Sequence, residues 1–204
     1  VNKFSNKKRA WEAEIIGKIR SMVDYLYPGI EKEMKETFIH ENENIMKIVK
    51  RKVDFRLSFH AWFLLKYEFP NGATAMEMAY SFPMECFNKK EKKMIKNFLN
   101  YKESIFEILN ISKDNKNYTI KDLSNNAIYL VKTIDLPAKF KKRELIQSII
   151  VKNLKNEYFF YGVVKSFRIF SRSKFVEKIL KEIKMEDILR AKRKRNKIEW
   201  EIEK

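Results

Sequence analysis

Residues 105–132 read IFEILNISKDNKNYTIKDLSNNAIYLVK, and here the spacing of apolar residues changes to a period of two. Apolar and polar residues alternate within it, which is the period of half-buried strands. Polar turns rich in Asn, Asp, Ser and Lys interrupt the alternation twice. The pattern therefore predicts three short strands, at Ile105–Ile111, Tyr118–Leu123 and Ala127–Lys132.

Two further strands are expected downstream, at Leu145–Leu154 and Tyr158–Phe170, and the second of them is expected to bend at Gly162. Five short strands with starts about ten residues apart are typical of a small antiparallel barrel or curled sheet. Residues 137–143 then form a basic loop of this sheet.

The residues before the sheet predict helices. Apolar residues recur at helical spacing from Trp11 to Leu26 and stop before Pro28. Further helices are expected from Ile30, after the capping residue Thr74, and over Lys89–Tyr101. Residues 53–65 alternate like a strand and then become continuously apolar, so helix and strand both remain open there.

After the sheet, Ser171 or Ser173 is expected to cap a last helix, and the alternation after Asn196 resembles a short strand. The fold class is therefore α+β: a helical N-terminal part, then a small antiparallel β-barrel-like sheet, then a basic C-terminal helix. The predicted parts are a mainly helical domain over 1–102, a small antiparallel β-module over 103–170, and a basic C-terminal helix and tail over 171–204 that packs on the β-module.

Three runs in the middle of the chain resemble a known group of proteins. They are Trp62–Phe69 with Asn71–Thr74, Ser104–Leu109 leading to Asp122 and Leu123, and Tyr158–Gly162. Over roughly residues 50–165 they resemble the region that often precedes a SEC-C metal-binding motif in bacterial and archaeal proteins. The resemblance implies a helical module joined to a small β-module, and it supplies no catalytic residues.

The chain departs from that group in two respects. The SEC-C motif is a Cys/His zinc knuckle, whereas this chain has one Cys and two His, so neither the knuckle nor its zinc is expected. Lys66 also stands where the group tends to have an Asp.

Composition limits the setting of the protein. The single Cys86 excludes an internal disulfide and fits a reducing, cytoplasmic location. No apolar stretch follows the basic start Val1–Arg9, and the run Ala61–Leu65 is too short to cross a bilayer, so a soluble protein without a secretory signal is expected. Abundant Lys and Glu with one Gln fit a thermophile and fit an AT-rich genome equally well.

Positive charge is concentrated near the C-terminus. Residues 162–198 hold thirteen Lys or Arg against four acids, a net +9 of the +17 that the whole chain carries. Such crowding costs self-repulsion, which a polyanionic partner would relieve. A solvated tail balanced by the last three Glu residues is the alternative.

The candidate nucleic-acid-binding residues lie in this segment and in the loop before the fourth strand. They are Lys139, Lys141, Lys142, Arg143, Lys165, Arg168, Arg172, Arg190, Lys192, Arg193, Lys194, Arg195 and Lys197. The interleaved aromatic residues Tyr158–Tyr161 suit stacking on unpaired bases, but they suit packing in the sheet's core as well.

No motif for catalysis is present. The chain lacks a Gly-rich phosphate loop and a Gly-x-Ser-x-Gly elbow, and Cys86 lies in an apolar context that predicts an inert, buried thiol. Glu36 and His40 are too few for a metal site, so no metal or cofactor is expected. Whether carboxylates such as Asp54, Glu68 and Glu85 converge on a metal stays open.

These observations favour non-enzymatic nucleic-acid binding, to RNA or another single strand, through a basic C-terminal surface. The alternative is a protein-interaction scaffold that docks an acidic partner. The basic amphipathic last helix also suits an anionic lipid surface, but packing on the sheet explains its apolar side more simply, so no membrane partner is expected.

Overall fold

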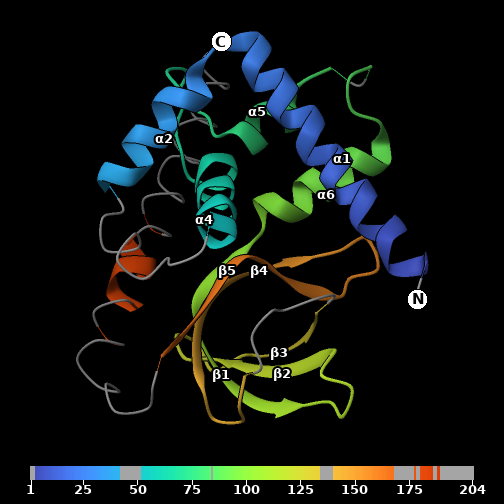
Figure 1. Ribbon diagram of the computed structural model, residues 1–204, viewed down its shortest axis with the longest axis vertical. Helices are drawn as coiled ribbons and strands as arrows, with labels where there is room; N and C mark the ends of the chain where they lie inside the picture. The colour runs from blue at the N-terminus through green and yellow to red at the C-terminus, as the bar shows by residue number, and fades with distance from the viewer. Residues whose placement is uncertain are drawn as a thin grey trace.

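The computed structural model describes residues 3–41, 52–83, 85–133, 140–167, 177, 180–185 and 188. Helices form a layer on one side of the molecule, and five strands form a closed barrel on the other (Figure 1). The expected order of a helical part followed by a sheet is confirmed, and the fold is α+β.

The helical layer contains α1 (Lys3–Leu26), α2 (Ile30–Glu41), α4 (Lys52–Leu65), α5 (Ala75–Ser81) and α6 (Lys89–Leu99). The ambiguous residues 53–65 lie within α4. The strand-like alternation there is misleading, because Phe59 and Phe63 are buried at helical spacing while Leu57 is 40% exposed.

Capping boxes fix the starts of the two short helices. At α5, the Thr74 hydroxyl accepts a hydrogen bond from the Glu77 N–H, and the Glu77 carboxylate accepts one from the Thr74 N–H. Asn88 and Glu91 make the same reciprocal pair at α6. The capping role expected for Thr74 is therefore confirmed.

The barrel contains β1 (Lys102–Ile111), β2 (Asn117–Asp122), β3 (Ile128–Lys132), β4 (Leu145–Lys152) and β5 (Tyr158–Phe167). Its strands are arranged in the order β1-β2-β3-β5-β4, and β4 pairs with β1 to close the ring. The expected sheet was antiparallel throughout, but β3 and β5 run parallel. An odd number of strands cannot alternate direction around a closed ring, so closure itself requires a parallel pair.

Asn residues make the tight turns between antiparallel strands. Asn115, Asn126 and Asn156 each adopt a left-handed backbone, with φ of 54°, 63° and 62°. Asn tolerates this conformation better than other non-glycine residues, because its short polar side chain can bond the local backbone. The polar turns seen in the sequence are therefore the hairpin turns of the barrel.

The two larger apolar clusters share the walls of the barrel. The interior cluster contains residues such as Phe106, Ile120 and Ile146. The larger helical cluster extends onto the outer face of the barrel, where it includes Ile149 and Val151 of β4. The helices therefore cover one wall of the barrel, and one core runs across the boundary predicted at residues 102 and 103.

Gly162 lets α4 approach β5 closely. Its φ is 75°, and an added Cβ would lie 3.0 Å from the Ala61 Cβ in α4. The residue also lies where the pairing of β4 with β5 shifts register, as the expected bend in this strand suggested. A side chain here would meet both a backbone penalty and a contact with the helix.

An ion pair joins α1, the first helix of the layer, to α6, the last. Lys18 Nζ in α1 lies 2.6 Å from Glu91 Oε1 in α6, and the Glu91 side chain is 4% exposed. Burial opposes ionisation of Glu91, but hydrogen bonds from Lys18 and from the Asn88 N–H outweigh it and lower the pKa below 4.5. Glu91 thus caps α6 and holds α1 with the same carboxylate.

The structure describes residues 177, 180–185 and 188 of the last predicted helix, and these residues are helical. Leu180 packs against Ile105 and Leu145 of the barrel, and Ile183 is buried. The expected caps Ser171 and Ser173 and the strand after Asn196 lie outside the described residues. Among the described residues, no helix combines the length and the apolar character needed to cross a membrane.

We expect Gly162→Ala to destabilise the fold more than Gly29→Ala. Both glycines have positive φ, so each substitution adds backbone strain of about 1–2 kcal/mol. Only Gly162 has a neighbour at 3.0 Å, and overpacking there adds about 1–3 kcal/mol. Urea unfolding of the two variants measures the difference, and equal losses would contradict the close contact of α4 with β5.

We also expect the Lys18–Glu91 pair to make stability depend on acid. The folded pKa of Glu91 lies below its ordinary value of 4.5, so the pair stabilises the fold above that pH and the contribution is lost as pH falls further. Melting temperatures across about pH 3–6 test this in the wild type, in Glu91→Gln and in the exposed control Glu33→Gln. In Glu91→Gln the melting temperature should fall less as the pH is lowered than it does in the wild type. The same change in Glu33→Gln would contradict the assignment of this acid dependence to the Lys18–Glu91 pair.

Candidate nucleic-acid interface

The turn that enters β4 holds three exposed cations, at residues 141–143. Phe140 anchors its start, because its side chain is buried in the barrel interior and its ring meets the Tyr118 ring at 6.1 Å between centroids. The Lys141 N–H donates to Glu144 Oε2 at 2.7 Å, which closes the turn. The backbone is therefore fixed while the cations project outward.

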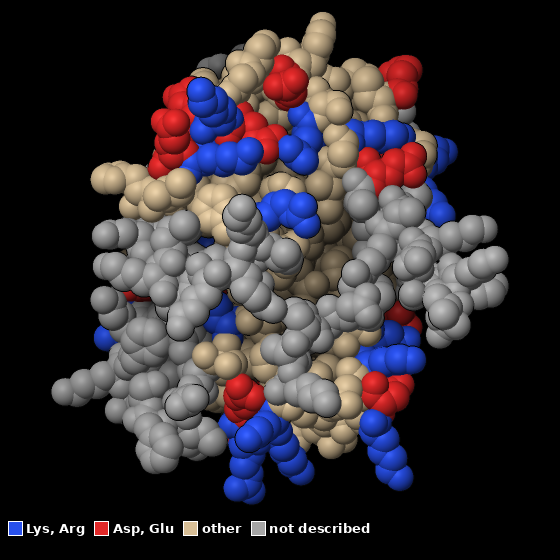
Figure 2. Space-filling model, viewed as in Figure 1, with Lys and Arg blue, Asp and Glu red and all other residues tan. Residues whose placement is uncertain are grey.

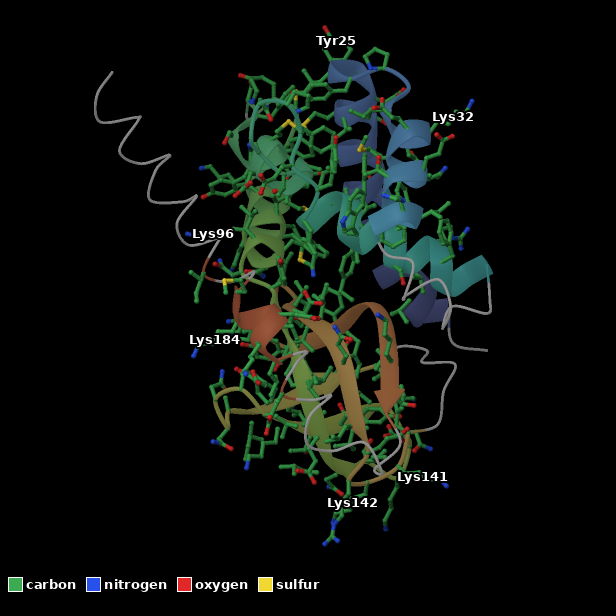
Figure 3. All side chains as sticks on the ribbon, turned by 90° about the vertical axis from the view of Figure 1, so that its left-hand side faces the viewer. Tyr25, Lys32, Lys96, Lys141, Lys142 and Lys184 are labelled. Atoms are coloured by element: carbon green, nitrogen blue, oxygen red, sulfur yellow. The ribbon has the colours of Figure 1, made fainter. Side chains whose placement is uncertain are left out.

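The same turn runs beside β1. The Arg143 N–H donates to the Ile108 carbonyl at 2.7 Å, and Arg143 adopts a left-handed φ of 69°. Lys141 and Lys142 point away from the molecule at the end of the barrel farthest from the helices (Figure 3). Three of the candidate residues thus form one exposed basic turn.

The outer face of β2 and β3 carries an exposed apolar pair. Ile128 and Leu130 of β3 are 62% and 58% exposed, because Tyr129 and Val131 take the inward positions. Their cross-strand partners on β2 are Lys121 and Thr119. We call Thr119, Lys121, Ile128, Leu130 and Lys132 the β2–β3 face.

Sequence reasoning missed this face. The apolar run 127–131 places apolar residues on both sides of β3, and the half that cannot point into a small barrel must point out. The sequence therefore did contain a sign of this face, namely more consecutive apolar residues in β3 than one side of a strand can bury.

Two loops with further cations border the β2–β3 face. The loop between β1 and β2 carries the exposed Lys113 and Lys116, and the loop between β4 and β5 carries the exposed Lys155. The Thr133 N–H donates to the Lys116 carbonyl, which ties the first loop to the end of β3. An ion pair from Lys132 to Glu157 ties the same end to the second loop.

Charge on the barrel is predominantly positive. Residues 102–133 and 140–167 include eleven Lys and Arg and six acids. One of these acids, Asp122, is buried and accepts hydrogen bonds from Ser104 and Ser124, so it offsets little surface charge. On the face shown in Figure 2, Lys and Arg side chains project from the lower end, where the barrel lies, with acidic side chains among them.

The aromatic run Tyr158–Tyr161 of β5 is partly buried and packs against both cores. Tyr158 and Phe160 contact the interior cluster, and Phe159 and Tyr161 contact the helical cluster. Burial raises the pKa of the Tyr161 hydroxyl, in keeping with its position under the helices. Of the two readings of these rings, the structure therefore favours core packing over base stacking.

Lys165 lies apart from the basic turn. It lines a cavity between α4 and the barrel, beside Lys66 and Glu103. Burial lowers the pKa of its ammonium group; the Glu103 carboxylate partly opposes this, and the Lys66 charge reinforces it. Lys165 is therefore a half-buried cation and does not belong with the exposed candidate cations.

The other candidate cations fall outside the described residues. They are Lys139, Arg168, Arg172, Arg190, Lys192, Arg193, Lys194, Arg195 and Lys197. The described interface accordingly consists of the β2–β3 face, its bordering loops and the basic turn.

The thiol of Cys86 is exposed, so the expectation of a buried Cys was wrong. The apolar context misled because Phe87, the next residue, takes the buried position in the loop before α6. His40 and Glu36 are exposed on α2. Within the part of the chain that the structure describes, no three His, Cys, Asp or Glu side chains gather where they could hold a metal ion.

Comparisons with known proteins return no relative. No known protein family, no curated protein sequence and no solved structure matches the chain. The resemblance of residues 50–165 to the region before SEC-C motifs therefore remains a prediction.

Proposed function

We propose that this protein binds single-stranded nucleic acid in the cytoplasm, without catalysis, through the β2–β3 face of its barrel and the basic residues around it. One observation carries the proposal: the closed order β1-β2-β3-β5-β4, with the helices packed on the β4–β5 wall. This five-stranded arrangement is that of OB-type barrels, whose strand 2–3 face and bordering loops bind oligonucleotides or oligosaccharides.

Charge favours the nucleic acid over the sugar. The exposed cations of the two loops border the β2–β3 face, where phosphates of a bound strand would lie, and the basic turn beside β1 adds three more at the end of the barrel. The basic segment 190–197 would add further phosphate contacts. A neutral oligosaccharide would gain nothing from this charge.

The burial of the β5 rings bears on selectivity. Stacking on aromatic rings supplies much of the base contact in other single-strand binders. Here Ile128 and Leu130 offer only aliphatic contact on the described face. Affinity should therefore come mainly from phosphates, with strong salt dependence and weak preference for base sequence.

Fluorescence polarisation with labelled single-stranded RNA, single-stranded DNA and duplex DNA, across about 50–300 mM salt, tests the proposal. The test variant combines Lys113→Gln, Lys141→Gln and Lys142→Gln. The matched control combines Lys32→Gln, Lys93→Gln and Lys96→Gln, which removes the same charge from exposed sites on the helical layer. A third variant neutralises Arg190, Lys192, Arg193, Lys194 and Arg195.

We expect single strands to bind more tightly than duplex DNA. Because each lost phosphate contact lowers the salt slope by about 0.7 for a single strand, the barrel variant should lose about 2 units of slope. The control should bind like the wild type. Equal losses in the barrel variant and the control would reduce the binding to general attraction by a basic protein and would overturn the proposal.

The scaffold alternative draws on the same cations but uses Ile128 and Leu130 as its main contacts, since exposed apolar residues favour a protein partner. It predicts that Ile128→Ser with Leu130→Ser abolishes capture of a partner protein at high salt. Single-strand binding that falls steeply with salt and survives these two changes would favour the nucleic acid.

A further inference from the structure

A small cavity lies at the seam between the helical layer and the barrel, and we call it the seam pocket. It measures about 90 Å³ and takes its lining from α2, α4, β1, β4, β5 and the residue after α4. The lining residues that matter to its chemistry are Trp62, Lys66, Glu103, Gln147, Tyr161 and Lys165. It is separate from the β2–β3 face.

Charge in the seam pocket is unbalanced. Lys66 Nζ lies 2.7 Å from Glu103 Oε2, and both side chains are largely buried, so this carboxylate is already committed. Lys165 is the second ammonium group of the lining, and within the described part of the chain it makes no hydrogen bond or ion pair. The lining therefore holds two cations and one carboxylate, and the Lys165 ammonium is the charge for which the lining supplies no carboxylate of its own.

Such a charge needs a partner. Removing an ammonium group from water is unfavourable unless an opposite charge or several hydrogen bonds compensate it. Burial lowers the pKa of Lys165, and the charge of the Glu103 carboxylate offsets this only in part.

The walls define what fits. Trp62 and Tyr161 contribute aromatic surface, and the Gln147 carboxamide contributes a second donor next to Lys165, since the two residues pair across β4 and β5. A single water needs roughly 10–15 Å³ of space of this kind, so a cavity of about 90 Å³ has room for a small anion. We propose that the seam pocket binds a small oxyanion, a carboxylate or a phosphate group, with Lys165 as its charge partner and Gln147 as a neighbouring donor.

The test follows Trp62 emission in the full chain carrying Trp11→Phe and Trp200→Phe, because Trp62 is then the only indole. Sodium phosphate, sodium acetate and sodium chloride are titrated at equal ionic strength. Saturable change with phosphate or acetate, absent with chloride, supports the pocket, and the stronger of the two identifies its chemistry. Responses identical to that of chloride would overturn it.

Lys165→Met removes the charge and keeps the length of the side chain, and Lys93→Met is the control on an exposed face of α6. Loss of a charge-assisted hydrogen bond should weaken binding by at least about tenfold in the first variant and leave it unchanged in the second. An unchanged constant in Lys165→Met would contradict the assignment.

A second measurement needs no variant in the pocket. Brief acetylation of the wild type with acetic anhydride, followed by mass spectrometry of peptides, compares Lys165 with and without saturating phosphate. Protection of Lys165 while Lys93 reacts equally in both supports occupancy of the pocket, and equal labelling of Lys165 opposes it. Neither result depends on whether the β2–β3 face binds nucleic acid.

Discussion

Close packing of α4 against β5 at Gly162 fixes how the helices lie on the barrel. Because this glycine has no side chain, Ala61 can approach the strand, and the helices come to rest on the β4–β5 wall. The helices then cover that wall around the seam pocket, and the opposite wall, built from β2 and β3, is left outside the helical layer (Figure 1). The position of one helix thus decides which side of the barrel stays outside the helical layer.

The same packing decides what kind of chemistry the free side can offer. The aromatic residues of β5 serve the two cores, so cations and two aliphatic side chains dominate the described part of the free side. A surface of this kind is suited to a charged backbone rather than to reading bases. The rings of Tyr158–Tyr161 are thus used in packing, while most of the exposed cations of the barrel lie in its loops and on the β2–β3 face.

Local sequence patterns predicted most of the helices and strands, but they did not predict how the strands close into a ring. The alternation of residues 105–132 identified three strands, and the helical spacing and capping residues identified most helices, because both signals lie within a few residues. The parallel pairing of β3 with β5 joins residues far apart in the chain. It follows from closure of the five-stranded ring and not from any local sequence pattern. For the same reason the sequence could group Lys165 with exposed cations but could not place it under a helix, and it could not show that Cys86 and Phe87 face opposite ways.

The core that crosses from the helices to the barrel also orders the events of synthesis. The helical region ends at Leu99, but its core is incomplete until Val151 and Phe159 arrive about fifty residues later. At about 5–20 residues per second, the helices leave the ribosome some 3–10 s before their partners, with apolar surface uncovered. This interval is when a nascent chain of this protein most needs a chaperone, and closing the ring of distant strands is the slow step that ends it.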